Sequence, residues 1–300
     1  MGKLQNYLKN KNISVYIFLL LPIIIYIIFF IIPNFSALYY SFLKWDGLNP
    51  VKEFIGLKNY IRLFKNAIFL LALKNTLIYT VTLILGSNIF GLLIALLIYR
   101  SSRNHTILRT FFFLPAMLST VAAGFIWGFI YDPNIGAINT FLRVIGLESL
   151  TTSWLANPKI VIFSIVMVHM WVGIGYSMVL FIVGLQNIGI EIYEAAEIDG
   201  ANKFQNFFHI TLPLLKPTTS VCLLLTTISG FVSFDFIYIM TKGGSDHSSE
   251  VLATLLFQEG FKFSNVGYSA AISVILMIVV LIISILQIQF FRDSELKTVK

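Results

Sequence analysis

The sequence predicts an all-α membrane protein with six transmembrane helices. Hydrophobic residues make up 57% of the 300 residues and charged residues only 12%, whereas soluble globular domains carry about 25% charged residues. Six apolar windows cover about half of the chain, and Asp235 is the one Asp, Glu, Lys or Arg residue inside them. The expected spans are 14–33, 75–99, 110–131, 160–190, 218–241 and 263–291.

Helices explain these windows better than strands. A hydrocarbon core about 30 Å thick needs roughly 20 helical residues, and every window reaches that length. Strands of a membrane barrel alternate apolar and polar residues over about 10 residues, whereas these windows are apolar on all sides. The first window follows basic residues as a signal peptide does, but its apolar run is too long and lacks a small-residue cleavage site. We therefore expect a retained first helix.

The segments between the spans predict short surface helices and no soluble domain. Residues 34–74 contain Trp45-Asp46-Gly47 and then an amphipathic stretch at 57–70, which is typical of an interfacial helix. Residues 132–159 contain turn formers and a short amphipathic run at 138–145. Residues 242–262 begin with Gly243-Gly244, which favours a turn. Residues 1–13 and 292–300 are expected to be short tails of one membrane domain, 14–291.

Charge and cysteine content exclude several other classes of protein. The formal net charge is +7, but the basic residues lie in short loops beside apolar spans, which favours lipid headgroups over nucleic acid as their partner. The single cysteine, Cys222, excludes an intrachain disulfide and a cysteine-based metal site. Basic residues are densest at 100–109 and after 291, so the positive-inside rule favours both termini in the cytosol.

An acidic loop separates the fourth and fifth predicted spans. Residues 186–217 include E-I-Y-E-A-A-E-I-D-G, in which acidic residues recur along one helical stripe. We expect a helix from about Ile190, capped by Asn187 and ended by Gly200. A second amphipathic helix with several phenylalanines is expected to follow and to stop at Pro213. The acidic side chains are Glu191, Glu194, Glu197 and Asp199.

The spacing within this loop resembles that of a known family. Glu194-Ala195-Ala196, then Gly200, then Ile210-Thr211-Leu212-Pro213 match the E-A-A-x3-G-x9-I-x-L-P pattern of binding-protein-dependent ABC importer permeases. The chain resembles in particular the carbohydrate permeases of the maltose and glycerol-3-phosphate type. Further similar stretches are W-D-G, 54–60, Trp171, 234–238 and 241–244. Gly189 and Ser245 depart from the family pattern, which usually has proline at both positions.

The resemblance implies a transport subunit that does not itself bind or hydrolyse ATP. No G-x-x-x-x-G-K-[ST] motif or catalytic cluster is present in the sequence, so we expect no enzyme activity, and ATP and Mg would bind to partner subunits. By the resemblance, Glu194 pairs with a basic residue of a cytoplasmic ATPase. Ala195 and Ala196 allow close approach, and Gly200 reverses the chain. The loop must then face the cytosol, which agrees with both termini being on the cytosolic side. The chain is expected to be a multi-pass protein of the bacterial cytoplasmic membrane.

The resemblance also implies the remaining partners. They are a second homologous permease subunit, two ATPase subunits, an extracytoplasmic solute-binding protein and a sugar, either an oligosaccharide or a polyol phosphate. ATP-driven closure of the ATPases would turn a cavity between the two permeases outward, and hydrolysis would reset it.

Polar residues at helical spacing are the candidates for a substrate path. Positions i, i+4 and i+7 share one helical face, and two spans repeat this spacing where maltose-type permeases line their sugar site. Such small or hydroxylated residues can also serve only to pack helices closely. Asp235 is a separate candidate, because a carboxylate within a span is costly, although it can also be structural. The candidates are His169, Gly173, Tyr176, Thr226, Gly230, Ser233 and Asp235.

Two alternatives remain open at the level of sequence. The first is an ABC permease for a non-sugar solute, since the acidic loop does not distinguish solutes. The second is an ion-coupled secondary transporter, but that class uses several buried carboxylates and only Asp235 is available.

Overall fold

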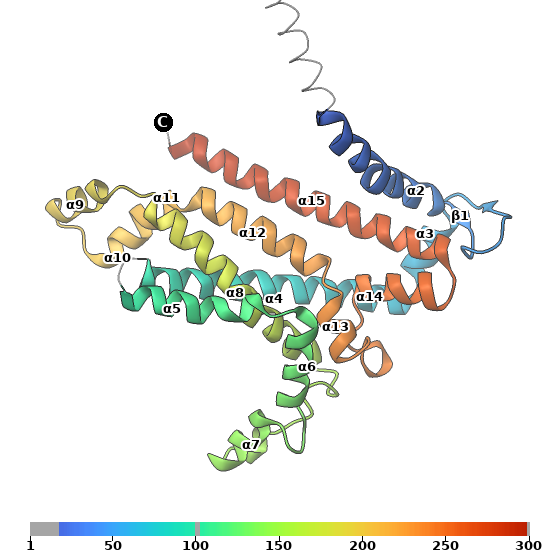
Figure 1. Cartoon of the computed structure of the whole chain (residues 1–300), viewed down its shortest axis with the longest axis horizontal. Helices are drawn as coiled ribbons and strands as arrows, with labels where there is room; N and C mark the ends of the chain where they lie inside the picture. The colour runs from blue at the N-terminus through green and yellow to red at the C-terminus, as the bar shows by residue number, and fades with distance from the viewer. Residues whose placement is uncertain (1–17, 100–102, 299–300) are drawn as a thin grey trace, which may run out of the picture. The chain divides into compact units, whose positions relative to one another are not determined.

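The computed structural model describes residues 18–99 and 103–298 (Figure 1). Two compact units contain them: the described residues up to Lys65 with 256–275, and residues 66–99 and 103–255 with 276–298. Five helices are long and apolar enough to cross a membrane, and one bent helix pair would make a sixth. The prediction of an all-helical membrane protein is confirmed in this form, with five or six candidate spans.

The first unit begins with a helix that runs through a proline. Helical residues Phe18–Tyr40 include the π-helical turn η1 (Ile27–Ile31) and α2 (Ile32–Tyr40). The helix continues past Pro33, where the predicted first span ends. Because Ile32 N–H bonds back to Ile27 O, the wide turn leaves Pro33 in the first turn of α2, where its missing N–H is tolerated. Residues 14–17 of the predicted span lie outside the described residues.

A short hairpin and an amphipathic helix follow in the first unit. Strands β1 (Leu43–Lys44) and β2 (Glu53–Phe54) pair antiparallel, a small addition to the all-α prediction. Helix α3 (Lys58–Lys65) occupies the place of the predicted interfacial helix and exposes Ile61 and Phe64. Its buried Asn59 fastens it to the hairpin, because the Asn59 amide donates to the carbonyls of Ser41 and Leu43, each at 2.9 Å.

The second unit is built on two long helices packed at close range. Helix α4 (Ala67–Ile98) begins earlier than the predicted residue 75, because the Asn66 side chain caps it by accepting from Ile68 N–H at 2.8 Å. Helix α8 (Val161–Gln186) lies against it. A Cβ added to Gly91 of α4 would lie 2.7 Å from the Cβ of Ser177 in α8. Only glycine permits this approach of the two backbones.

The third predicted span, 110–131, is not one straight helix. Helix α5 (Arg103–Phe113) continues into the 3-10 turn η2 (Leu114–Met117), and α6 (Thr120–Ile130) then departs at 96°. Pro115 stands at the start of η2, and the Ser119 hydroxyl caps α6 by accepting from Ala122 N–H at 3.2 Å. A proline followed by an N-cap residue explains both the end of one helix and the start of the next.

The fifth predicted span is interrupted near its end. Helix α12 (Lys216–Phe231) is followed by α13 (Asp235–Met240) after a break at 232–234. The Gln287 amide of the last long helix, α15 (Val266–Thr298), donates to the Thr227 hydroxyl of α12 at 2.8 Å. The connecting elements are α7 (Ala137–Val144), η3 (Glu148–Leu150), η5 (Ser245–His247), α14 (Leu252–Phe257) and η6 (Gln258–Lys262).

The acidic loop between α8 and α12 holds short helices. Helix α9 (Ile190–Ile198) starts where expected, but Asn187 ends α8 and Gly189 is the N-cap of α9, so the predicted asparagine cap is wrong. The next helical stretch comprises α10 (Lys203–Asn206), the π-helical turn η4 (Phe207–Thr211) and α11 (Leu212–Leu214). It does not stop at Pro213, because η4 places this proline in the first turn of α11 in the same way as η1 places Pro33.

Candidate functional site

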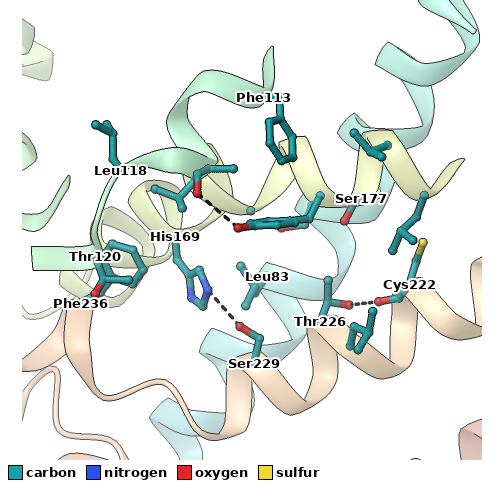
Figure 2. A pocket seen from close by; sticks show the side chains of 18 residues that line it. Leu83, Phe113, Leu118, Thr120, His169, Ser177, Cys222, Thr226, Ser229 and Phe236 are labelled. Atoms are coloured by element: carbon teal, nitrogen blue, oxygen red, sulfur yellow. Dashed lines mark hydrogen bonds between the residues drawn. The ribbon is translucent and has the colours of Figure 1, made fainter. Parts of the chain in front are cut away.

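A cavity of about 620 Å³ lies in the second unit beside the break between α5 and α6 (Figure 2). Helices α4, α8 and α12 supply most of its wall, and the η2 region and Phe236 of α13 supply the rest. Among the described residues that line it, none is an Asp, Glu, Lys or Arg. The wall is therefore mostly apolar, with uncharged polar groups at a few points.

The predicted face of α8 does line this cavity. His169, Gly173 and Tyr176 all border it, as their helical spacing requires. The Tyr176 hydroxyl donates to Ala116 O across the cavity at 3.3 Å, and its ring meets that of Phe113 edge-on at 5.5 Å. Tyr176 therefore connects α8 to the bent segment on the opposite wall.

The predicted face of α12 divides between the cavity and the helix packing. Thr226 lines the cavity, donates to Cys222 O at 2.8 Å and accepts from the Asn88 amide at 3.0 Å. Gly230 is buried against α4, where an added Cβ would lie 2.8 Å from Thr80 Cγ2. Gly230 thus serves helix packing in this arrangement, and it does not border the cavity.

Ser233 is also absent from the cavity wall but is connected to it. Its buried hydroxyl donates to Tyr79 Oη at 3.1 Å. Tyr79 Oη lies 2.9 Å from His169 Nδ1, and His169 Nε2 lies 3.1 Å from Ser229 Oγ. Figure 2 shows the imidazole of His169 pointing at Ser229. Four side chains from α4, α8, α12 and the segment after α12 therefore form one hydrogen-bonded chain.

Asp235 lies apart from this chain, in the first turn of α13. Its side chain is exposed and accepts from the Thr120 hydroxyl at 3.4 Å. A carboxylate in the first turn of a helix is stabilised by the positive end of the helix dipole. This position and the Thr120 contact tie the start of α13 to α6.

The second candidate site is helix α9. Figure 1 shows it with α10 and α11 at the end of the second unit where α8 ends and α12 begins. Glu191, Glu194, Glu197 and Asp199 are exposed, and none forms an ion pair with another described residue. Gly200 follows α9 with φ of +81°, a left-handed conformation that favours glycine, so it ends the helix as predicted.

Local contacts hold α9 in place. The Tyr193 hydroxyl lies 3.0 Å from Thr211 Oγ1 of η4. Asn202 and Gln205 form a reciprocal capping box at the start of α10. These bonds position α9 while leaving its acidic stripe open to a partner.

Several residues in or behind the cavity wall were not anticipated from the sequence. Tyr79, Ser87 and Asn88 are buried polar residues of α4, and the hydroxyl of Ser87 and Oδ1 of Asn88 have no hydrogen-bond partner among the described residues. Their signal was available, because polar residues at 76, 79–80 and 87–88 recur at helical spacing inside an apolar span. Phe113, Ala116, Leu118 and Thr120 depend on the bend after η2, which the apolar pattern does not reveal.

A mostly apolar cavity with a few uncharged polar groups lies between long apolar helices, and an exposed acidic helix lies at one end of the unit. These features define the class as a multi-pass membrane transport component. The comparisons make this assignment specific. The chain belongs to the family described as "Binding-protein-dependent transport system inner membrane component", which matches residues 87–294. It is therefore a permease subunit in the inner membrane, and the resemblance found in the sequence is confirmed.

Similar proteins share nearly their whole length with this chain. The probable ABC transporter permease protein YurN of Bacillus subtilis (strain 168) is 37% identical over 288 residues, which cover 95% of this chain and 99% of that protein. The multiple sugar-binding transport system permease protein MsmF of Streptococcus mutans serotype c is 34% identical over 278 residues, with coverages of 93% and 95%. Membership of this family excludes the alternative of an ion-coupled secondary transporter.

Solved structures share the fold. A bacterial ABC transporter involved in the import of the acidic polysaccharide alginate matches with a TM-score of 0.82 and 23% identity, covering 95% of this chain and 96% of that chain. A bacterial alginate ABC transporter in complex with a periplasmic protein that holds an alginate pentasaccharide matches with a TM-score of 0.79. At this identity the likeness concerns the arrangement of helices.

Proposed function

We propose that this chain is the permease of an ATP-driven importer for a neutral oligosaccharide, which passes through the cavity between α4, α8 and α12. The observation that carries the proposal is the cavity wall, whose described residues offer hydroxyl and imidazole groups but no Asp, Glu, Lys or Arg side chain. Neutral sugars need such uncharged donors and acceptors, whereas a polyol phosphate or an amino acid needs fixed charges. Relatives named for multiple sugars, starch degradation products and arabinooligosaccharides support the sugar class.

We further propose that six helices span the membrane and that α9 faces the cytosol. The Arg109 guanidinium donates to Ile98 O and Tyr99 O, and the Gln186 amide also donates to Tyr99 O. The end of α4 and the basic residue Arg109 therefore lie at the same end as the start of the acidic loop. Basic loops favour the cytosol, so residues 186–217 and both termini are placed there, with residues 14–291 as the permease domain.

In this proposal α9 couples the cavity to ATP hydrolysis. The acidic stripe of Glu191, Glu194, Glu197 and Asp199 has no ionic partner among the described residues, so it is available to basic groups of an ATPase subunit. Ala195 and Ala196 add little bulk, which permits close contact. Movement of α9 on ATP binding would be transmitted to α8 and α12, which flank the loop and line the cavity.

The complete importer would contain four further kinds of partner. They are a second homologous permease, two ATPase subunits that bind ATP and Mg, an extracytoplasmic binding protein and the sugar. The solved alginate transporter in complex with a periplasmic protein supports such an assembly. Alternating access would follow from a shift between two conformations that bind the ATPases differently.

Reconstitution tests this function. The assembled complex, in proteoliposomes with ATP at the α9 side, should take up at least one of maltotriose, arabinotriose and diacetylchitobiose from its binding protein. Tyr176→Ala, which removes a cavity side chain, should reduce uptake without preventing assembly. Uptake driven by an ion gradient without ATP, or uptake of amino acids in place of every sugar, would overturn the proposal.

A further inference from the structure

The hydrogen-bonded chain beside the cavity has a direction that its geometry fixes. Ser233 Oγ donates to Tyr79 Oη at 3.1 Å. Tyr79 is fully buried, and its only other hydrogen-bond neighbour among the described residues is His169 Nδ1 at 2.9 Å. Since the oxygen of Tyr79 already accepts from Ser233, its proton can be used only toward His169. Nδ1 must then be the unprotonated nitrogen of a neutral imidazole.

The opposite tautomer would leave a buried hydrogen-bond donor without an acceptor. If Nδ1 carried the proton, Tyr79 Oη would accept from both Ser233 and His169, and its own hydrogen would have no acceptor. An unsatisfied buried donor is strongly disfavoured relative to a satisfied one. The chain therefore selects the imidazole with its proton on Nε2, which faces Ser229 Oγ at 3.1 Å.

This tautomer decides what Ser229 offers to the cavity. Nε2–H donates to the Ser229 oxygen, so the Ser229 hydroxyl proton remains available, and no other hydrogen bond of Ser229 exists among the described residues. Thr226 and Tyr176 differ, because they donate their protons to the carbonyls of Cys222 and Ala116. Ser229 is exposed on the cavity wall, so its free proton faces the solute space.

We propose that Tyr79 and Ser233 are positioning residues that hold His169 with its proton on Nε2, so that Ser229 donates a hydrogen bond to an acceptor oxygen of the solute. The role in recognition rests on the proposed function of the cavity. The matching solute group is a hydroxyl or acetal oxygen of a neutral sugar. Neither Tyr79 nor Ser233 borders the cavity, and both act through His169.

The imidazole tautomer can be measured without knowing the solute. The complex is labelled with ¹⁵N-histidine and studied in lipid bilayers by solid-state NMR, and His169 is assigned by the signals that His169→Gln removes from the set of four histidines. We expect a protonated Nε2 and an unprotonated Nδ1. Tyr79→Phe should allow a second population with the proton on Nδ1. A proton on Nδ1 in the unaltered protein, or no change in Tyr79→Phe, would overturn the proposal.

Sugar binding tests the consequence for recognition. Equilibrium dialysis measures the Kd of the complex for radiolabelled maltotriose, arabinotriose and diacetylchitobiose. Ser229→Ala and Tyr79→Phe should each raise the Kd of a bound sugar about 3- to 10-fold, the scale of one hydrogen bond. In the Ser229→Ala background, Tyr79→Phe should have no further effect, because its influence passes through Ser229.

A second buried tyrosine provides the matched control. The Tyr131 hydroxyl donates to Ser164 O at 3.0 Å, outside the cavity wall, so Tyr131→Phe removes a comparable bond without touching the chain. Equal effects of Tyr131→Phe and Tyr79→Phe on the Kd would refute the positioning role. If none of the three sugars binds the unaltered complex, the sugar assignment fails, and the NMR result alone decides whether the chain fixes His169.

Discussion

Replacing Gly200 is expected to weaken ATPase binding through the backbone alone. Gly200 has φ of +81°, and a Cβ added to it would meet no atom within 4 Å. Side-chain collisions therefore do not contribute to the cost. A residue with a Cβ pays roughly 1–2 kcal/mol to adopt the left-handed conformation.

This cost acts directly on the docking-competent form. Helix α9 has nine residues, and an isolated helix of that length is marginal in water. A penalty of about 1–2 kcal/mol then lowers the competent population, and with it the apparent affinity, by about 5- to 30-fold. Gly200→Val should show this loss, whereas Gly200→Asn should lose much less, because asparagine tolerates the left-handed region.

The assay is titration of the permease in lipid nanodiscs with the purified ATPase subunit, read as the fraction bound. Thermal unfolding of the permease serves as the folding control and should be unchanged, since α9 is exposed. The reasoning is refuted if the valine and asparagine variants bind the ATPase equally well, or if the valine variant binds as tightly as the unaltered protein.

Three further predictions concern other parts of the second unit. Glu194→Lys should reduce ATPase binding at least about tenfold, with partial retention in Glu194→Gln, because it reverses the charge at the proposed contact; equal binding by both would contradict this. Gly230→Val should lower the free energy of unfolding of the permease in denaturant by about 1–3 kcal/mol, because a Cβ there would lie 2.8 Å from Thr80. Gly128→Val is the control and should not lower it, since no atom of the described residues lies within 4 Å of a Cβ at that position. The backbone N–H groups of residues 135 and 134 donate to Asp132 and hold the pKa of its carboxyl below its usual 3.8. The protection of these two N–H groups against hydrogen exchange is therefore complete above that pH and is lost as the pH falls through the lowered pKa. Amide hydrogen exchange should show this loss, and an unchanged pattern in Asp132→Asn would disprove it.

The sequence predicted the existence of the helices better than their ends. Apolar length alone identifies a spanning helix, so each predicted window overlaps a helix of the structure or the bent pair. Proline was taken as a stop at position 213, and the first predicted span ends at Pro33. Both helices continue, because a π-helical turn before each proline removes the need for its N–H. Such turns leave no mark in the apolar pattern of the sequence.

At the site as well, the residues that share one face of a helix were predicted, but the contacts between helices were not. The spacing of His169, Gly173 and Tyr176 placed them on one face, and all three line the cavity. The roles of Gly230 and Ser233 depend on which neighbour faces them, and α4 provides that neighbour in both cases. Tyr79 was not predicted, because polar residues at helical spacing were sought in the fourth and fifth spans and not in the second.

The tight pairing of α4 with α8 determines where this permease can deform. A Cβ at Gly91 would lie 2.7 Å from the Cβ of Ser177 and 3.1 Å from the backbone N of Met178, so a shift that brought a larger side chain to this contact would be blocked. Mechanical freedom is left to the interruptions at 118–119 and 232–234, which lie beside each other, because the Thr120 hydroxyl after the first donates to Asp235 after the second at 3.4 Å. A transport cycle in this chain would therefore be expected to move α6 and α13 together, while α4 and α8 keep their packing.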